Sequence, residues 1–191
     1  MQFNSTQLPN PETLLSDITN SIQSRLSDPH FANKCALIGI HSGGVWLMQR
    51  IIDSLNLDTQ HRDIPNGTLD AALYRDDYAQ RGLKAQSKPS NIAFNVQDKH
   101  IILIDDIFYT GRTTRAAMNE LFDYGRPASI TLCVLINRGG AELPIAPNIV
   151  GADILLKPNQ NLQLTQDTKG KLHLSLETNS LEADDQKAGN A

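Results

Sequence analysis

Two neighbouring carboxylates and a short polar loop occur close together in the middle of this sequence. Asp105 and Asp106 directly follow the apolar run 101–104. The loop 109–113, with the sequence YTGRT, leads into 113–124, where apolar residues recur at helical spacing. A short apolar run is typical of a buried strand, so the segment is predicted to form a strand, a loop and a helix. Because ligands of open α/β sheets bind at the carboxyl ends of strands, we expect a binding site here.

The loop after the carboxylates has the residue types of an anion site. A helix N-terminus offers unpaired backbone N–H groups and the positive end of the helix dipole, and both favour a phosphate. Gly111 lets the backbone approach a phosphate closely, and Thr110 and Thr113 add hydroxyl donors. Carboxylates for sugar hydroxyls, followed by a phosphate loop, suit a ribose 5-phosphate. The loop is not a Walker motif, because it lacks the preceding Gly-x4 and the Lys.

Each part of this pattern also has an ordinary structural explanation. An Asp-Asp pair alone is usually a solvated turn or a helix cap, and a Thr-Gly pair alone is usually a turn. Their joint position between a buried strand and a helix favours the binding site over these alternatives.

The rest of the chain supplies the elements that would position these residues. A first helix is predicted to start at Asn10-Pro11 and to end near Asp28-Pro29. A long polar excursion, 75–98, has the character of a lid and includes a short hairpin near 92–96. Further strands are predicted at 34–41, 68–74, 100–104, 129–136 and 149–156, a helix at 45–55, and a terminal hairpin at 162–166 and 171–176. Strands that alternate with helices predict an α/β fold with a central parallel sheet flanked by helices.

Length and composition indicate one ordinary globular domain. The chain has 191 residues, of which 40% are hydrophobic. It has no run of about 20 apolar residues that could span a bilayer, and its first ten residues lack the features of a secretion signal, so we expect a cytoplasmic protein. Cys35 and Cys133 both lie in apolar runs and are expected to be buried free thiols.

The net charge of −4 is unevenly distributed along the chain. Residues 177–191 carry four acidic side chains and one lysine, so most of the negative charge belongs to this tail. With one leucine and no aromatic residue, the tail is predicted to be disordered, and 1–176 to form a single domain. An acidic chain is a poor candidate for binding nucleic acid by bulk charge.

Several separated segments together resemble one protein family. The segment 101–114, IILIDDIFYTGRTT, closely resembles the phosphoribosyl-pyrophosphate (PRPP) motif of type I phosphoribosyltransferases. The segments 69–77, 124–130 and 137–145 are similar to the PyrR subfamily, the pyrimidine-operon regulatory proteins with uracil phosphoribosyltransferase activity. The likeness covers about residues 10–176, with the motifs in matching order and spacing.

This resemblance implies a type I phosphoribosyltransferase fold, with a small hood that holds the base and a flexible loop. It also implies transfer of ribose 5-phosphate from PRPP to uracil, with Mg²⁺ as cofactor and UMP and pyrophosphate as products. By matched motif position it implies catalytic and metal-binding roles, direct or through water, for Asp105 and Asp106. It assigns PRPP phosphate binding to Tyr109, Thr110, Gly111, Arg112 and Thr113, the pyrophosphate turn to Ser42, Gly43 and Gly44, the flexible loop to Arg75 and Asp76, and proximity to the base to Ile136, Asn137 and Arg138.

The pyrophosphate turn departs from the family pattern. The family usually has Lys-Thr-Arg-Gly there, whereas this chain has His41-Ser42-Gly43-Gly44 and so lacks both cations. Backbone amides would then bind the pyrophosphate. The loss of one charge-assisted contact costs on the order of 1.5–3 kcal/mol, so we expect weaker PRPP binding.

The RNA-binding side of the resemblance departs further. The family binds messenger RNA as a dimer through a basic face, and the residues at the matched positions here carry no positive charge: Ser16, Asp17, Asn20, Gly140, Ala141 and Ala152. RNA binding is therefore expected to be weak, unless contacts have moved elsewhere, for example to Arg25 or Lys34. The alternatives to an enzyme are a UMP-responsive pyrimidine-operon regulator and a nucleotide sensor that acts through a protein partner. The resemblance implies a homodimer or higher homo-oligomer.

Overall fold

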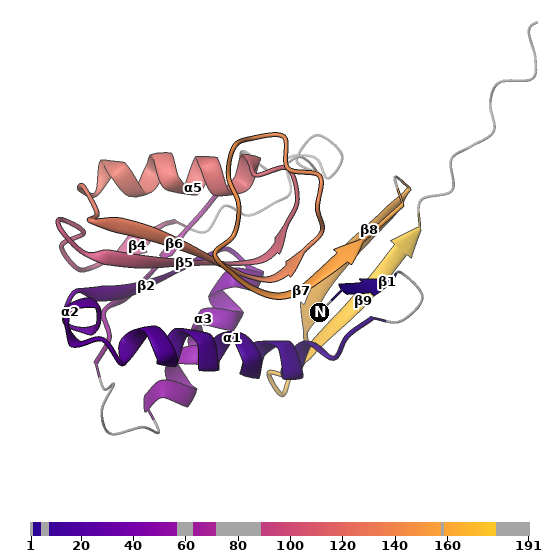
Figure 1. Ribbon diagram of the computed structural model, residues 1–191, viewed down its shortest axis with the longest axis horizontal. Coiled ribbons are helices and arrows are strands. Elements are labelled where there is room, and N and C mark those ends of the chain that lie inside the picture. The colour runs from indigo at the N-terminus through magenta and orange to yellow at the C-terminus, as the bar shows by residue number, and fades with distance from the viewer. Residues whose placement is uncertain (1, 5–7, 57–62, 72–88, 158, 179–191) are drawn as a thin grey trace, which may run out of the picture.

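The computed structural model of the chain describes residues 2–4, 8–56, 63–71, 89–157 and 159–178 (Figure 1). Within this part of the chain, the largest element is a seven-stranded sheet. In spatial order its strands are β1 (Gln2–Asn4), β7 (Ile149–Leu155), β6 (Ser129–Asn137), β5 (His100–Phe108), β2 (Cys35–Ile40), β3 (Asn66–Leu69) and β4 (Asn91–Ile92). Every neighbouring pair is parallel except β3 and β4. The predicted α/β architecture with a central parallel sheet is confirmed.

Helices cover both faces of this sheet (Figure 1). α1 (Pro11–Leu26) and α3 (Gly43–Asn56) lie on one face, and α5 (Arg112–Asp123) lies on the other. The short α2 (Pro29–Ala32) follows α1. Among the helices in the described ranges, none has the length and apolar character needed to cross a membrane.

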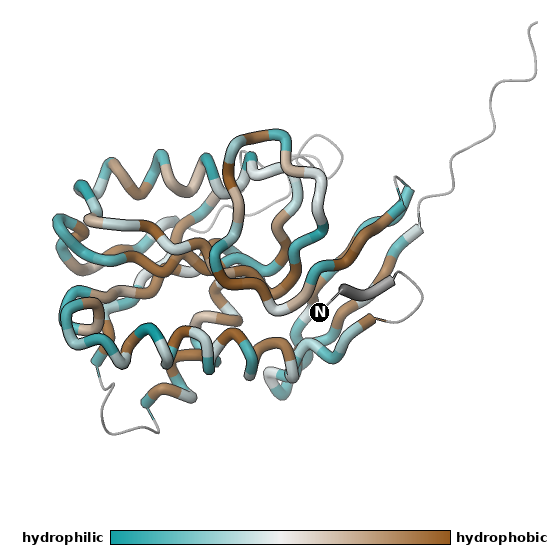
Figure 2. Tube along the Cα trace, in the orientation of Figure 1, coloured by the Kyte–Doolittle hydropathy of each residue, from teal (hydrophilic) through white to brown (hydrophobic). Residues whose placement is uncertain are grey.

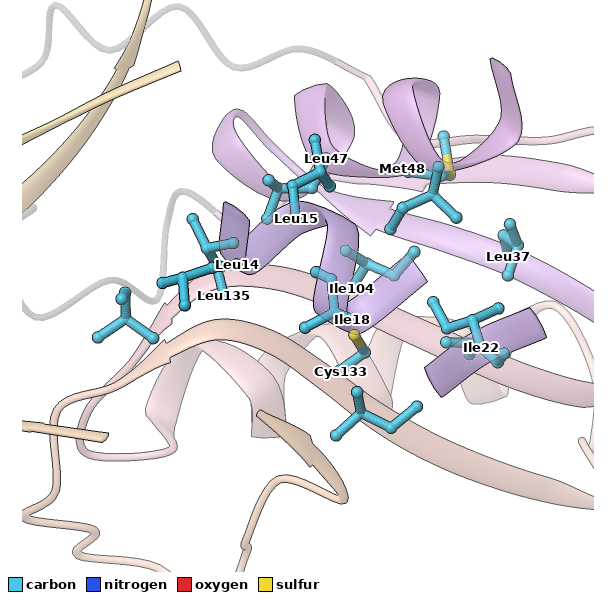
Figure 3. Close-up of a cluster of buried hydrophobic side chains, with 14 of the residues drawn as sticks. Leu14, Leu15, Ile18, Ile22, Leu37, Leu47, Met48, Ile104, Cys133 and Leu135 are labelled. Atoms are coloured by element: carbon cyan, nitrogen blue, oxygen red, sulfur yellow. The ribbon is translucent and has the colours of Figure 1, made fainter. Parts of the chain in front are cut away.

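The strands separate two apolar cores because their side chains point to alternate faces. On β5, Ile102 and Ile104 pack with the cluster beneath α1 and α3, whereas Ile101 and Leu103 pack with the cluster beneath α5. Hydrophobic residues accordingly follow the strands and the inner sides of the helices (Figure 2). Figure 3 shows the first cluster, where side chains from α1, α3 and the strands meet.

Both cysteines are free and buried, as predicted. Burial raises the pKa of Cys35 and of Cys133 to about 12. Neither thiol therefore ionises near neutral pH, which disfavours a role as a nucleophile.

Strand boundaries near the candidate site differ from the prediction. The prediction ends a strand at Ile104, but β5 continues through both carboxylates to Phe108, because its parallel pairing with β6 continues to Asn137. The strand predicted at 68–74 instead spans Asn66–Leu69, so 70 and 71 lie beyond its end, and 72–74 lie outside the described residues.

Three other local expectations also change. The hairpin expected near 92–96 is wrong, because Asn91–Ile92 instead pairs antiparallel with β3. Gly43 and Gly44, which lie before the helix expected at 45–55, are the first residues of α3. The edge strand β1 was not predicted, since three residues carry too little pattern to indicate a strand.

The predicted terminal hairpin is confirmed as β8 (Gln160–Gln166) and β9 (Leu172–Thr178), here called the hood hairpin. It packs on the core through three buried leucines, Leu162, Leu164 and Leu172. β9 includes Glu177 and Thr178, so the folded part extends two residues past the predicted boundary at 176. The rest of the predicted tail, 179–191, lies outside the described residues.

Glu12 in the first turn of α1 joins that helix to α3 and to the hood hairpin. Its carboxylate accepts a hydrogen bond from Arg50 at 2.6 Å and another from the backbone N–H of Leu172 at 2.9 Å. Arg50 also donates to the carbonyl of Gly170 at 2.9 Å. These contacts attach the turn of the hood hairpin to the two helices on one face of the sheet.

Candidate active site

The two adjacent carboxylates lie on β5 itself, near its carboxyl end. Asp105 is 5% exposed, and Asp106 is half-buried. Leu103, two residues before Asp105, packs beneath α5, and Ile104, two residues before Asp106, packs beneath α3. Because strand residues alternate between faces, the two carboxylates belong to opposite faces of the sheet end. The backbone N–H of Asp106 donates to Asp105 Oδ1 at 3.0 Å, and that of Ile107 donates to Asp106 Oδ1 at 3.0 Å.

The first turn of α3 is packed directly against this end of β5. A Cβ on Gly43 would lie 2.7 Å from the Cβ of Asp106 and closer still to its carboxylate. A Cβ on Gly44 would overlap the carbonyl oxygen of Ile104. Only glycine fits at either position in this arrangement. The fold thus brings the predicted pyrophosphate turn, 42–44, into contact with the acidic pair.

Backbone hydrogen bonds hold this turn from both sides. His41 donates its N–H to the carbonyl of Leu69 at 2.9 Å, which attaches the end of β2 to β3. Trp46 donates to the carbonyl of Ser42 at 3.3 Å, which closes the first turn of α3. The peptide bond between His41 and Ser42 is cis. Ser42 is half-buried and precedes the two buried glycines.

The loop after β5 opens α5, as the sequence predicts. Gly111 is the N-cap residue, with φ at +88°, and has no side chain to cap the helix, while the N–H of Arg112 donates to the Thr110 hydroxyl at 3.3 Å. The positive φ is the left-handed conformation that favours glycine. Thr110 is buried, Thr113 is half-buried, and Tyr109 is 40% exposed. The N-terminus of α5 therefore offers backbone N–H groups beside hydroxyls, the arrangement expected for a phosphate.

The segment after β6, 138–142, lies along this loop. The N–H of Arg138 donates to the carbonyl of Phe108 at 2.9 Å, and that of Glu142 donates to the carbonyl of Thr110 at 3.0 Å. Glu142 also forms an ion pair with Arg112 at 2.6 Å. The side chain of Arg112, predicted to bind phosphate, is thus directed to Glu142. Both side chains of the pair are at least half exposed, so it adds little stability.

The residues predicted to lie near the base occupy different environments. Ile136 is fully buried in the core, and so has no exposed atom to offer a ligand in this conformation. Asn137 donates to Asp153 at 2.8 Å. The guanidinium of Arg138 stacks on the Tyr109 ring, 3.9 Å from its centroid, and donates to the carbonyl of Gln160 at 2.8 Å. The sequence pattern did not indicate these contacts, because they join segments far apart in the chain.

Comparison with known proteins identifies the family. The phosphoribosyl transferase domain family matches residues 5–160 of the chain. The chain belongs to this family. A protein called bifunctional protein PyrR from Pseudomonas fluorescens is 44% identical over 179 residues, which cover 91% of this chain and 98% of that protein. A second protein of that name, from Nitrosococcus oceani, is 47% identical over 156 residues, covering 82% of this chain and 86% of the other. The chain is a phosphoribosyltransferase of the PyrR family, as its sequence motifs suggest.

Solved structures support the same fold. A hypoxanthine-guanine phosphoribosyltransferase from Bacillus anthracis superposes with a TM-score of 0.55 at 15% identity, over 82% of this chain and 87% of the other. A hypoxanthine phosphoribosyltransferase from Staphylococcus aureus gives 0.53 at 20% identity, over 76% and 74% of the two chains. The PyrR-family chain thus has the type I phosphoribosyltransferase fold.

The positions matched to RNA contacts of the PyrR family divide into two groups. The three on α1, Ser16, Asp17 and Asn20, are exposed, as are Gly140 and Ala141. These five positions are therefore part of the protein surface, and none of them adds positive charge to it.

Ala152, by contrast, is 1% exposed and lies in the core, so its place on a surface charge face is a wrong expectation. Of the two basic residues considered as substitutes for lost RNA contacts, Lys34 is exposed, and Arg25 donates to the Thr131 hydroxyl at 3.3 Å. Arg75 and Asp76, predicted for the flexible loop, lie outside the described residues.

Proposed function

We propose that this PyrR-family chain transfers ribose 5-phosphate from PRPP to N1 of uracil, giving UMP and pyrophosphate. The observation that carries the proposal is the contact between Asp106 and Gly43. It joins the acidic pair of β5 to the first turn of α3, while the same strand leads into the N-terminus of α5. One end of the sheet therefore carries the groups needed for a sugar, a pyrophosphate and a 5-phosphate. The choice of uracil rests on the resemblance to the PyrR family.

Each group of PRPP would meet a matching part of this site. Asp105 and Asp106 would take the ribose hydroxyls, and the loop 109–113 would take the 5-phosphate. The turn 42–44 would bind the pyrophosphate through backbone N–H groups, because it carries no lysine or arginine. The half-buried carboxylate of Asp106 is suited to stabilise positive charge that develops on the ribose, as in other oxocarbenium-like transition states.

The reaction requires little proton chemistry from the protein. The bond between C1 of the ribose and the pyrophosphate oxygen breaks, and a bond forms between C1 and N1 of uracil. The N1 proton is already acidic and leaves to solvent, so no strong general base is needed. The main task of the chain is to hold the two substrates in line and to exclude water.

The acidic pair fits Mg²⁺ as a partner of PRPP. Carboxylate oxygens are the ligands that Mg²⁺ takes in proteins. The described part of the chain contains no group of three or more His, Cys, Asp or Glu side chains that could hold a metal ion. Because the two carboxylates lie on opposite faces of the strand, Asp105 and Asp106 would hold Mg²⁺ through water or through oxygens of PRPP. When bound, the ion supplies positive charge against the leaving pyrophosphate.

A turnover assay tests the proposal. Purified protein with PRPP and Mg²⁺ should release pyrophosphate when uracil is added, and less with hypoxanthine or orotate. Asp106→Asn should reduce turnover by about 100-fold or more, because it removes charge beside the ribose. Asp123→Asn, at the exposed end of α5, is the matched control and should be unaffected. No uracil-dependent release by the unchanged protein would contradict the proposal.

A UMP-responsive regulator with little turnover is the second candidate. It is favoured by the pyrophosphate turn, since both cations of the family pattern are missing from it. Calorimetry should then show UMP binding by a protein that turns over no substrate. For pyrimidine-leader RNA we expect weak binding with strong salt dependence, because exposed positions on α1 lack positive charge. Tight, UMP-stimulated RNA binding at physiological salt would favour the regulator.

The proposal also includes the cellular location and the oligomeric state of the enzyme. The two buried free thiols favour a reducing compartment, and we propose a cytoplasmic location. We propose a homodimer or higher homo-oligomer on the family resemblance, and sedimentation velocity of the purified protein tests it.

A further inference from the structure

Arg138 connects two parts of the molecule that the chain itself keeps apart. It follows β6 directly, and its guanidinium stacks on the ring of Tyr109, 3.9 Å from the centroid. The same guanidinium donates to the carbonyl of Gln160 at 2.8 Å and to the side chain of Asn161 at 3.3 Å. Tyr109 begins the loop that opens α5, whereas Gln160 and Asn161 begin β8 of the hood hairpin. One planar group therefore contacts both the phosphate loop and the hood.

The Tyr109 ring is held on a second side by the segment that follows Arg138. A Cβ on Gly140 would lie 2.9 Å from Cε2 of the ring, and Gly140 has φ at +85°. The backbone of Arg138 is also tied to the loop, because its N–H donates to the carbonyl of Phe108. The orientation of the ring thus depends on where Arg138 and Gly140 lie.

The hood hairpin has different attachments at its two ends. Its turn is attached to α1 and α3 through Arg50, which donates to the carbonyl of Gly170. At the other end, beside the loop 109–113, the hydrogen bonds from Arg138 attach the start of β8. A guanidinium has a fixed fork of donors and a flat face. A shift of β8 therefore moves the partners of these donors, and so tilts the flat face of the Arg138 guanidinium that stacks on the Tyr109 ring.

We infer that Arg138 is a positioning residue that couples the hood hairpin to the phosphate loop, so that the base and the 5-phosphate of a nucleotide bind cooperatively. The inference rests on the proposed function, in which the loop 109–113 holds the phosphate, and it takes the hood hairpin as the base-holding hood that the family resemblance implies. Ordering of either part by its own half of the ligand orders Arg138, and so lowers the cost of ordering the other part. The half-exposed ring of Tyr109 carries this coupling from Arg138 to the loop 109–113 by contact alone.

Calorimetric titration with three unreactive ligands tests the coupling. UMP carries both base and phosphate, uridine carries no phosphate, and ribose 5-phosphate carries no base. Arg138→Met removes the charge and the donors but keeps the length of the side chain. In this variant, the Kd for UMP should rise by roughly tenfold more than the product of the increases for uridine and ribose 5-phosphate. Such a factor is within the range typical of coupled sites. Arg126→Met, at an exposed turn before β6, is the matched charge control and should change none of the three.

Two further variants separate coupling from a merely structural role. Tyr109→Leu should reproduce the selective loss for UMP, because it removes the ring that Arg138 contacts, while Tyr109→Phe should retain the coupling. Arg138→Lys keeps the charge without the fork of donors and should restore only part of it. Equal weakening of all three ligands in Arg138→Met, or unchanged coupling in Tyr109→Leu, would overturn the inference.

The outcome is independent of the turnover assay. If the unchanged protein turns over no uracil but loses coupling in Arg138→Met, the proposed reaction fails and the inference stands. If it turns over uracil and the three ligands weaken equally, the inference fails and the reaction stands. If UMP does not bind the unchanged protein, both fail. Urea unfolding of each variant confirms that the titrated protein is folded.

Discussion

The N-termini of α3 and α5 lie at the same end of the sheet, and both begin at glycines, but for different physical reasons. Gly43 and Gly44 at the start of α3 are needed because Asp106 and the carbonyl of Ile104 occupy the space of their side chains. Gly111 at the start of α5 has its nearest neighbours at 3.6 Å, so a side chain has room there. Its requirement is the positive φ of the N-cap position.

This difference shows that a glycine in a predicted phosphate-binding turn need not be there for the ligand. At α3, contact with β5 already excludes any other residue, before a pyrophosphate is considered. At α5, the glycine is required by its backbone conformation, and a side chain there would meet no close neighbour. The two helices should therefore respond differently to the same substitutions, and the following predictions test this from the largest expected effect to the smallest.

Gly44→Ala should have the largest effect on stability. The new methyl group would overlap the backbone carbonyl of Ile104, which cannot move without disturbing the central strand. We expect a loss of about 3 kcal/mol, the upper end for overpacking a core. Urea unfolding measures it, with Ser54→Ala on the exposed side of α3 as control. A loss below about 1 kcal/mol would show that α3 is less tightly docked than the contact indicates.

Gly43→Ala should affect activity more than stability. Here the carboxylate of Asp106 can rotate away, and its Cβ, 2.7 Å from the new methyl group, requires only a small backbone shift, so unfolding should change less than for Gly44→Ala. The displaced carboxylate would no longer meet the ribose correctly, and a displacement of about 1 Å can cost roughly 100-fold in rate. Steady-state kinetics with uracil and PRPP measures kcat/KM. Unchanged kcat/KM would show that activity does not depend on the contact between this turn and Asp106.

Gly111→Ala should cost about 1 kcal/mol, because an L-residue is strained in the left-handed conformation. Asn tolerates that conformation better, so Gly111→Asn should recover part of the stability. At Gly44 the same pair of substitutions should be equally harmful, since the obstacle there is a backbone atom. Urea unfolding of the four variants compares the two helix starts directly, and a parallel response at both would contradict the comparison.

Glu12→Gln should have the smallest effect, and it should depend on pH. Arg50 on α3 holds the pKa of Glu12 below its ordinary value of 4.5, chiefly through a hydrogen bond to the carboxylate, with burial opposing the shift. A lowered pKa stabilises the fold above the unfolded pKa, and this stabilisation is lost as the pH falls through the folded pKa. The pair is partly exposed, so the loss in Glu12→Gln near neutral pH should be below about 1 kcal/mol.

Unfolding at pH 7 and at pH 3 distinguishes this contribution from the glycine contacts. The difference between Glu12→Gln and the unchanged protein should be smaller at the lower pH, whereas the deficit of Gly44→Ala should persist, since steric overlap does not titrate. A difference that stays constant with pH would show that Glu12 acts through packing alone.

Local patterns were sufficient for much of the fold and for the composition of the candidate site. The capped start of α1, the buried strands and the terminal hairpin are each encoded within a few consecutive residues. The strand, loop and helix around Asp105 and Asp106 are equally local, so their order was predictable. The end of β5 was not, because a parallel ladder depends on the neighbouring strand, and β6 extends β5 to Phe108.

The sequence by itself determined which chemical groups stand at the end of β5 and that a helix N-terminus follows them, because hydrophobic periodicity and glycine act over neighbouring residues. Only the tertiary structure decided what those groups touch. It set Gly43 against Asp106, Glu142 on Arg112, and the guanidinium of Arg138 on Tyr109. Such contacts join residues far apart in the chain, and their geometry follows from strand register and helix docking, which no single segment encodes.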